Sequence, residues 1–138
     1  MSRPAFFDTN ILLYGDDTSS PRKQDVSIAL FKEHLVNQTA IVSLQVLQEY
    51  FSAATRKLGL DAGVAQRRVE DIAQAQVVRF TPRDIIASIE LHRLTRSSFW
   101  DALIVHAARI AGAAVLYSED FQTDAVIGGV RVVNPFEP

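Results

Sequence analysis

The sequence predicts an α/β domain of three layers, α/β/α, in which a mainly parallel sheet of about five strands lies between two layers of helices. Three observations predict this class. Short apolar runs recur along the chain, segments with the spacing of amphipathic helices separate them, and capping or turn residues stand at the boundaries. Strands that are apolar throughout and joined by helices form parallel sheets covered on both faces, with right-handed crossovers.

The short apolar runs predict five strands, each bounded by residues typical of caps and turns. The strands are expected at residues 5–7, 40–42, 77–80, 114–117 and 130–133. Gly128-Gly129 forms a turn before the last strand, and Asn134-Pro135 ends regular structure after it.

Capping signals place two helices between the first and second strands. Asn10 can cap a brief helical turn over residues 11–13, directly after the first strand. Pro21, which follows Ser20, suits the first turn of a longer helix whose apolar stripe continues to about Asn37.

Two further helices are expected between the second and third strands. Ser43 caps the first of them, and Gly59 supplies its C-terminal stop. Asp61 caps the second, which continues to about Ala75.

Another helix pair follows the third strand. Pro82 suits a first turn, and Asp84 lies near the positive end of that helix dipole. Ser97 or Ser98 opens the next helix, which ends at Gly112 and leads into the fourth strand.

Length and composition are those of one ordinary domain, residues 1–138, with a 48% hydrophobic content that supports a substantial core. The absence of cysteine excludes disulfides and thiolate zinc sites. The N-terminal residues offer too short an apolar stretch for a secretory signal, so a cytoplasmic location is expected. Asp101, His106 and Arg109 interrupt the most apolar region, 99–117, which argues against a membrane span.

The net charge of -2 argues against a protein that binds nucleic acid through a broad basic face. Neutralising many phosphates requires clustered Lys and Arg residues. Any role with nucleic acid must therefore depend on a local site.

Four acids lie at points that a parallel sheet can bring together. Asp8 follows the first strand, and Asp120 lies just after the fourth. Glu49 lies in the helix after the second strand, and Asp101 begins the helix that leads into the fourth. Ligands of such sheets bind beyond the carboxyl ends of the strands, where the strand order reverses. We expect the four side chains to converge on one crevice, provided that the helix of Asp101 begins on the same side.

Such a cluster predicts a metal site and a class of reaction. Carboxylates packed together repel one another unless they are protonated or hold cations, and their oxygens suit Mg²⁺ or Mn²⁺. Bound ions of this kind activate water and neutralise the charge that develops on a phosphodiester during in-line displacement. The acids therefore predict a metal-dependent nuclease.

Each acid also has an ordinary structural interpretation. Asp8 with Thr9 and Asn10 could form only an Asx turn or a helix cap. Glu49 could belong to a solvated stripe in which it pairs with Arg56. Taken singly, these interpretations compete with the functional one.

The two remaining acids have similar alternatives. Asp101 could simply complement its helix dipole. Glu119 becomes the ligand in place of Asp120 if the register of the fourth strand differs. The functional interpretation therefore depends on all four acids together.

Four segments carry a family resemblance that covers nearly the whole chain. They are Phe7-Asp8-Thr9-Asn10, the helix position Glu49, Ser98-Phe99-Trp100-Asp101-Ala102-Leu103-Ile104, and Leu116-Tyr117-Ser118-Glu119-Asp120-Phe121. In order, spacing and apolar context they resemble the PIN-domain ribonucleases, specifically the VapC-type toxins of type II toxin–antitoxin systems.

The resemblance implies a PIN-like fold and an endoribonuclease dependent on Mg²⁺ or Mn²⁺. The implied catalytic and metal-binding acids are Asp8, Glu49, Asp101 and Asp120, supported by Thr9, Asn10 and Ser118. Ser118 stands where the family often has threonine, which preserves the hydroxyl group. The resemblance also implies an RNA substrate, a homodimer and a small antitoxin protein that wraps the surface and reaches into the acidic crevice.

Other functions fit the sequence less well. A phosphotransferase of the haloacid-dehalogenase type needs a second acid two residues after Asp8, where Asn10 stands. A response-regulator receiver needs a lysine after a late strand, and the last lysine is Lys57. The histidines are scattered, which disfavours metal-free RNA cleavage. The alternative from another class is a PIN-like module that binds RNA or protein without cutting, and the presence of all four acids weighs against it.

Overall fold

The computed structural model describes residues 3–137, in which six strands and six helices follow one another. The strands are β1 (Ala5–Phe7), β2 (Ala40–Ser43), β3 (Gln76–Val78), β4 (Val115–Tyr117), β5 (Val126–Ile127) and β6 (Val130–Val133). The helices are α1 (Thr9–Tyr14), α2 (Pro21–Val36), α3 (Leu44–Arg56), α4 (Ala62–Ile72), α5 (Pro82–Thr95) and α6 (Phe99–Ile110). Within this described part of the chain, none of the helices has the length and apolar character needed to cross a membrane.

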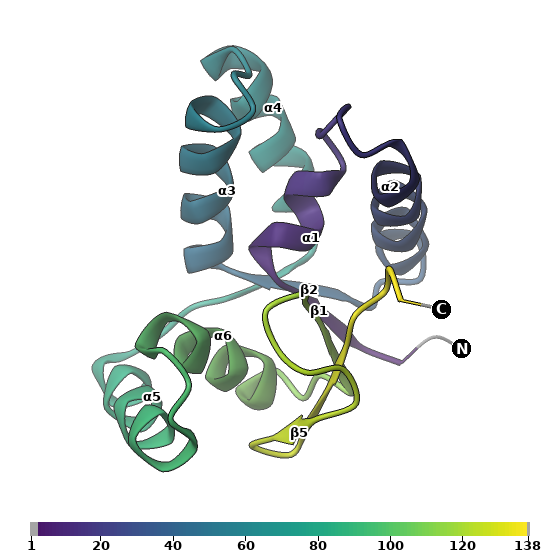
Figure 1. Ribbon diagram of the computed structural model, residues 1–138. Coiled ribbons are helices and arrows are strands. Elements are labelled where there is room, and N and C mark those ends of the chain that lie inside the picture. The colour runs from purple at the N-terminus through teal and green to yellow at the C-terminus, as the bar shows by residue number, and fades with distance from the viewer. Residues whose placement is uncertain (1–2, 138) are drawn as a thin grey trace.

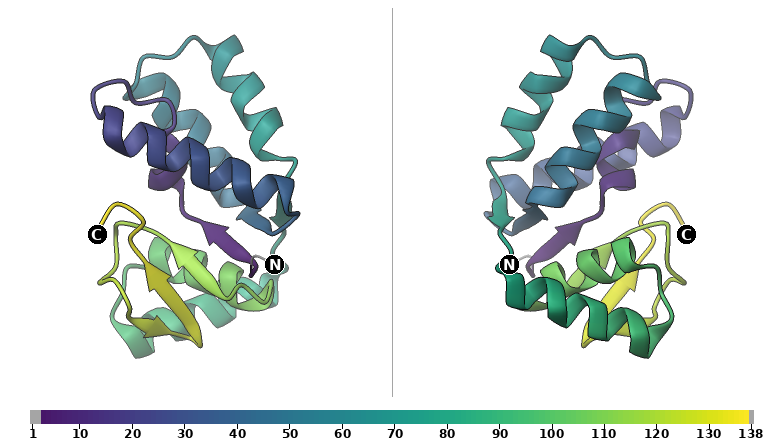
Figure 2. Two further views of the ribbon diagram at one scale, coloured as in Figure 1. Left: turned by 90° about the vertical axis from the view of Figure 1, so that its right-hand side faces the viewer. Right: turned by 90° about the vertical axis from the view of Figure 1, so that its left-hand side faces the viewer.

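The strands form one mostly parallel sheet in the order β3-β2-β1-β4-β6-β5. Neighbouring strands are parallel except for β5 and β6, which form an antiparallel pair at one edge. Helices α1 to α4 gather on one side of the sheet, whereas α5 and α6 cover the other side (Figures 1 and 2). The predicted α/β class and its three layers are therefore confirmed.

The strand order reverses beside β1. From β1 the chain builds β2 and β3 on one side, and then crosses through α5 and α6 to place β4 on the other side. Phe7 of β1 pairs with Tyr117 of β4, and the Asp8 N–H donates to the Tyr117 carbonyl at 3.0 Å. The carboxyl ends of β1 and β4 thus meet where open α/β sheets bind ligands.

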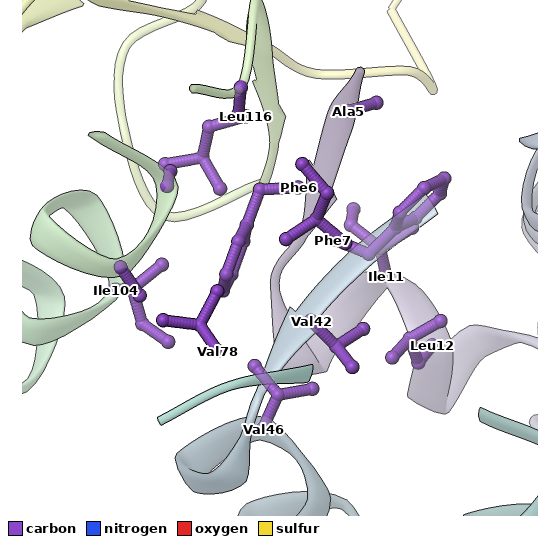
Figure 3. Packing of buried hydrophobic residues seen from close by; sticks show 14 of the residues in the cluster. Ala5, Phe6, Phe7, Ile11, Leu12, Val42, Val46, Val78, Ile104 and Leu116 are labelled. Carbon is purple, nitrogen blue, oxygen red and sulfur yellow. The ribbon is translucent and has the colours of Figure 1, made fainter. Parts of the chain in front are cut away.

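Strand β1 is buried against both helical layers. Phe6 points toward Ile104 of α6 (Figure 3), and the ring of Phe7 meets the ring of Phe31 in α2 edge-on, 5.0 Å between centroids. Both side chains are fully buried. Burying one large apolar side chain contributes roughly 1.5–3 kcal/mol, so β1 is held from both faces. Asp8, the next residue, therefore has a firmly fixed backbone.

Local caps set the starts of the helices that carry the other acids. Ser43 Oγ accepts from the Val46 N–H at 3.3 Å at the start of α3, and Ser98 Oγ accepts from the Asp101 N–H at 3.0 Å in α6. Asp61 caps α4 in the same way, as predicted. These bonds satisfy N–H groups that lack partners in the first helical turn.

A polar contact fastens α5 to α6. Asp84 Oδ2 accepts from the Thr81 N–H at 2.8 Å in a capping box, while Asp84 Oδ1 lies 3.0 Å from Nε2 of His106 on α6. The Thr81 backbone bond, followed by the His106 contact, lowers the pKa of Asp84. Helix α6, which bears Asp101 in its first turn, is thereby tied to α5 through its second half.

Several details differ from the sequence-based predictions. The sheet has six strands rather than about five, because β5 has only two residues and shows too little apolar pattern. It pairs with β6 across the predicted Gly128-Gly129 turn. Helix α1 begins at Thr9 with Asp8 as its N-cap, instead of a turn capped by Asn10. Strand β3 ends at Val78, two residues before its predicted end.

Candidate active site

The four predicted acids line one pocket of about 560 Å³. They come from four separate segments: Asp8 after β1, Glu49 on α3, Asp101 on α6 and Asp120 after β4. The structure therefore brings together every acid that the sequence analysis selected, and α6 begins on the same side as the strand ends.

Asp8 is the most deeply buried of these acids, with 4% of its surface exposed. Its Oδ1 accepts from the Thr9 N–H at 2.7 Å, and its Oδ2 accepts from the Ser118 hydroxyl at 2.7 Å. Burial raises the pKa of Asp8 to about 7 in spite of these two bonds, and the negative charges of Asp120 and Glu49 add to the increase. A proton or a cation at this position therefore stabilises the folded protein.

Ser118 connects Asp8 to Asp120. Its hydroxyl group donates to Asp8 Oδ2, and its Oγ accepts from the Asp120 N–H at 3.0 Å. The residue is fully buried. One side chain therefore sets both the orientation of the Asp8 carboxylate and the backbone of the loop that carries Asp120. The resemblance assigned Ser118 a supporting role, and its contacts fit that role.

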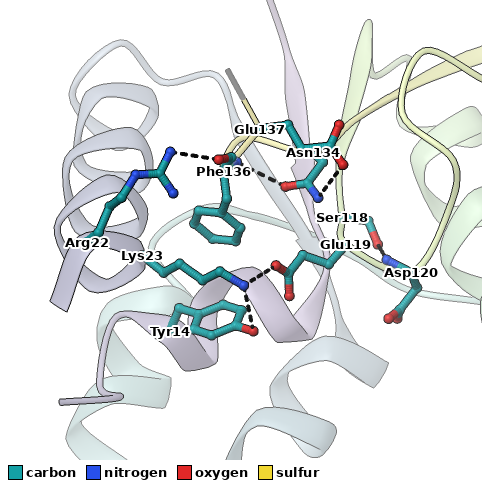
Figure 4. Close-up of polar contacts among 9 residues, drawn as sticks. All are labelled: Tyr14, Arg22, Lys23, Ser118, Glu119, Asp120, Asn134, Phe136 and Glu137. Carbon is teal, nitrogen blue, oxygen red and sulfur yellow. Dashed lines mark hydrogen bonds and ion pairs between the residues drawn. The ribbon is translucent and has the colours of Figure 1, made fainter. Parts of the chain in front are cut away.

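Glu119 lies outside the acidic pocket. Its carboxylate forms an ion pair with Lys23 at 2.7 Å, and Lys23 also reaches the hydroxyl of Tyr14 at 3.3 Å (Figure 4). Asp120, by contrast, lines the pocket. The register of β4 therefore favours Asp120, and not the alternative Glu119, as the acid of the site.

Glu49 lies at the middle of the pocket wall formed by α3. Its Oε1 accepts from the Thr9 hydroxyl at 2.8 Å, and its Oε2 accepts from Gln45 Nε2 at 3.3 Å. Among residues 3–137 it forms no ion pair with Arg56, so the solvated-pair interpretation is not what the structure contains. Thr9 holds Glu49 in place and belongs to the site.

Asp101 is partly buried in the first turn of α6. Burial raises its pKa although the contact with Ser98 lowers it, and the charges of Asp120 and Glu49 raise it further. A residue that only complemented a helix dipole would not be expected to have a raised pKa. The like charges of the pocket thus act on Asp101 as they act on Asp8.

The chemistry of the pocket fits a hard divalent cation. Its acidic donors are all carboxylate oxygens, and Oδ1 of Asn10, which also lines the pocket, is buried with no hydrogen-bond partner among the described residues. Within residues 3–137, no three histidines or acids lie close enough to hold an ion jointly. A single ion would therefore contact at most two of these carboxylates directly; Mg²⁺ usually takes one or two and keeps several waters.

Sequence reasoning missed several other residues that line the pocket. They are Gln45, Gln48, Arg56, Lys57 and Trp100. The helical spacing already put Gln45 and Arg56 on the face of Glu49, which is the signal that could have identified them. Trp100 lies in the first turn of an apolar helix and is nevertheless 62% exposed.

The model of the PIN domain family matches residues 5–127. The chain belongs to this family. A comparison with curated proteins finds no match. The family model covers all four acids, so the pocket lies wholly within the PIN domain.

This PIN domain is similar to solved structures of toxin–antitoxin proteins. VapC20 of Mycobacterium tuberculosis, described as a toxin that cleaves the sarcin-ricin loop, is 21% identical, with a TM-score of 0.63 over 84% of this chain and 89% of that chain. A toxin–antitoxin complex from Klebsiella pneumoniae is 24% identical, with a TM-score of 0.66 over 97% and 99%. VapBC2 from Rickettsia felis, bound to a promoter DNA fragment, is 16% identical, with a TM-score of 0.66 over 93% and 96%. At these identities the similarity shows a shared fold.

The contacts of Ser118 lead to a prediction for this PIN domain. Ser118→Ala removes the hydrogen bond that lowers the pKa of Asp8, so we expect that pKa to rise further. The pH profile of any activity that needs ionised Asp8 should shift to higher pH, with a loss of about 10- to 100-fold near neutral pH. Ser118→Thr keeps the hydroxyl and should keep the profile. An unshifted profile in Ser118→Ala would contradict the positioning role.

Proposed function

We propose that this PIN domain is a metal-dependent endoribonuclease of the VapC type, the toxin of a toxin–antitoxin pair. The observation that carries the proposal is the convergence of Asp8, Glu49, Asp101 and Asp120 on one pocket. The raised pKa values of Asp8 and Asp101 support it, because perturbed carboxylates concentrate at functional sites.

The four acids would hold Mg²⁺ or Mn²⁺ between them, one or two by direct contact and the others through bound water, with Asn10 Oδ1 as a further oxygen donor. A bound divalent ion supplies an activated water and neutralises charge on the phosphodiester. The chain's own residues prepare this site. Ser118 orients Asp8, Thr9 orients Glu49, and the cap at Ser98 sets the first turn that bears Asp101.

The proposed partners are an RNA substrate, a cognate antitoxin and a second copy of the chain. The antitoxin is supported by the similar fold of the Klebsiella pneumoniae toxin–antitoxin complex and of VapBC2. The RNA substrate is supported by the same fold in VapC20, which is described as a toxin that cleaves the sarcin-ricin loop. The homodimer follows from the resemblance to VapC-type toxins, and the cytoplasmic location is the one that the sequence analysis expects.

Cleavage of RNA by the purified protein tests the proposal. Mixed cellular RNA is incubated with antitoxin-free protein in Mg²⁺ or Mn²⁺, in EDTA, and with the Asp8→Asn variant. We expect cleavage only by the wild-type protein with metal, because both controls remove a component of the acidic site. Folded protein that cuts no RNA under any metal condition would instead favour a PIN-like module that binds RNA or protein without cutting.

A further inference from the structure

Besides the four acids, the candidate active-site pocket is lined by one aromatic and two cationic side chains. The proposed metal site gives these three side chains no role. Trp100, Arg56 and Lys57 all line the pocket, and all three are exposed. We propose that these residues guide an unpaired RNA strand across the pocket, with Trp100 stacking on a base and the two cations contacting phosphates. This inference rests on the proposed function and names the residues of this chain that contact the RNA.

Trp100 is exposed, although most of the residues that follow it in α6 are buried. Residues 102–108 of α6 are all buried, but 62% of Trp100 is exposed. Its backbone is held, because Gln45 Nε2 on α3 donates to the Trp100 carbonyl at 3.4 Å. Its ring also packs against Phe99, 5.4 Å between centroids. A large aromatic surface that is held beside a polar pocket, and not used in the core, suits base stacking.

Helix α3 connects the ring to the cations. Gln45, which contacts the Trp100 backbone, and Arg56 are eleven positions apart on this helix. At ~1.5 Å per residue, this separation is about 16 Å. Glu49 lies between them, so a strand that stacks on Trp100 passes the acids before it reaches the cations. The pocket is therefore shaped for a strand and not for a single nucleotide.

Arg56 and Lys57 are available for phosphate. Both are exposed at the end of α3, and among residues 3–137 neither forms an ion pair. They are the only cations among the described residues that line a pocket with four acids. Because the chain carries a net charge of -2, attraction for a polyanion has to come from such local positive charge.

Stacking on Trp100 selects unpaired RNA. In a duplex each base already stacks on its neighbours, so its face is hidden from a protein side chain. Loops and single strands expose base faces, and proteins recognise them by stacking on aromatic rings. We therefore expect loops and single strands to bind here in preference to duplexes.

Fluorescence tests the stacking directly, because Trp100 is the only tryptophan in the chain. A ten-nucleotide RNA strand of mixed sequence is titrated into Asp8→Asn protein with Mg²⁺ and into wild-type protein in EDTA. We expect saturable quenching, and much weaker quenching by the same sequence as a duplex or by a strand that lacks bases. Because these variants lack the tryptophan, their binding is measured by the anisotropy of the same strand carrying a fluorescent label. Trp100→Ala should weaken binding by about 5- to 150-fold, whereas Trp100→Phe keeps a ring and should lose less. Leu94→Ala, an exposed apolar residue on α5, is the matched control and should bind normally.

Salt dependence tests the cations. For single strands, each phosphate contact contributes about 0.7 to the slope of log affinity against log salt concentration. Arg56→Gln and Lys57→Gln should each reduce the slope by about that amount. Arg67→Gln, an exposed arginine on α4 outside the pocket, is the matched control and should leave the slope unchanged.

The outcomes separate this inference from the proposed function. If RNA is cleaved but neither quenches Trp100 nor binds more weakly to Trp100→Ala, the stacking role is wrong and the nuclease stands. If RNA quenches Trp100 but is never cleaved, the binding path stands and the nuclease is wrong. If Trp100→Ala changes the oligomeric mass without changing RNA affinity, Trp100 belongs to a contact between copies, and the inference is overturned.

Discussion

Asp8→Asn and Asp101→Asn are each expected to lower RNA cleavage by more than about 100-fold while the protein remains folded, since even residues that only support metal ligands contribute 10- to 100-fold. Each change removes one negative charge from the pocket and leaves a side chain of nearly the same shape. The remaining acids then attract a divalent ion less strongly. Burial and like-charge repulsion destabilise the charged forms of both carboxylates. Replacing either by a neutral amide should therefore not unfold the protein. The measurement is kcat/KM with Mg²⁺, together with thermal unfolding of each variant.

Glu119→Gln provides the matched control for this prediction. Glu119 precedes Asp120 in the chain, but it pairs with Lys23 outside the pocket. A partly exposed ion pair of this kind contributes about 0–1 kcal/mol, so activity should stay within about fivefold of wild type. Normal activity in Asp8→Asn or Asp101→Asn would refute the assigned site. A large loss in Glu119→Gln would show that the pocket extends to that side of the loop.

Metal-free protein is expected to lose stability as the pH rises from about 4 to about 7. The pKa of Asp8 is raised from 3.8 to about 7 on folding. Between these values the folded state binds more protons than the unfolded state, so the free energy of unfolding falls with increasing pH and levels off above pH 7. A shift of about three units corresponds to an upper bound on the order of 4 kcal/mol. The raised pKa of Asp101 acts in the same direction.

Urea unfolding at pH 5 and pH 8 in EDTA measures this effect. Asp8→Asn should be less sensitive to pH and more stable than wild type at pH 8, because asparagine needs no proton. Mg²⁺ should stabilise the wild-type protein more at pH 8 than at pH 5, since the ion binds the ionised acids. Asp124→Asn, which alters an acid whose side chain is 70% exposed, is the control and should behave as wild type. An identical pH dependence in wild type and Asp8→Asn would show that Asp8 does not titrate in this range.

Most of the helices and strands could be predicted from local sequence, because the capping and periodicity signals that define them act between near neighbours. Ser43 and Ser98 cap α3 and α6 through hydrogen bonds to residues three positions away, as predicted. The alternation of strands and helices likewise predicted the parallel sheet. Asn10 was the wrong cap for α1 because Asp8, one residue after β1, already accepts from the Thr9 N–H and leaves no loop between strand and helix.

The selection of Asp8, Glu49, Asp101 and Asp120 also came from sequence, through their order and their positions beside predicted elements. What sequence left open was the choice between Asp120 and Glu119. The register of β4 against β1 and the ion pair between Glu119 and Lys23 favour Asp120. Lys23 lies on α2, 96 positions from Glu119, and no local pattern links them.

Tertiary structure alone decided the electrostatics of the acids and the character of the pocket rim. The raised pKa of Asp8 depends on burial by distant segments and on charges from other elements. Trp100 lies in a segment with the local pattern of a core helix. Its ring is nevertheless exposed, because it lies near the start of α3 where no other element of the described chain covers it. Caps and periodicity are properties of neighbouring residues, whereas burial and mutual repulsion depend on which segments the fold packs together.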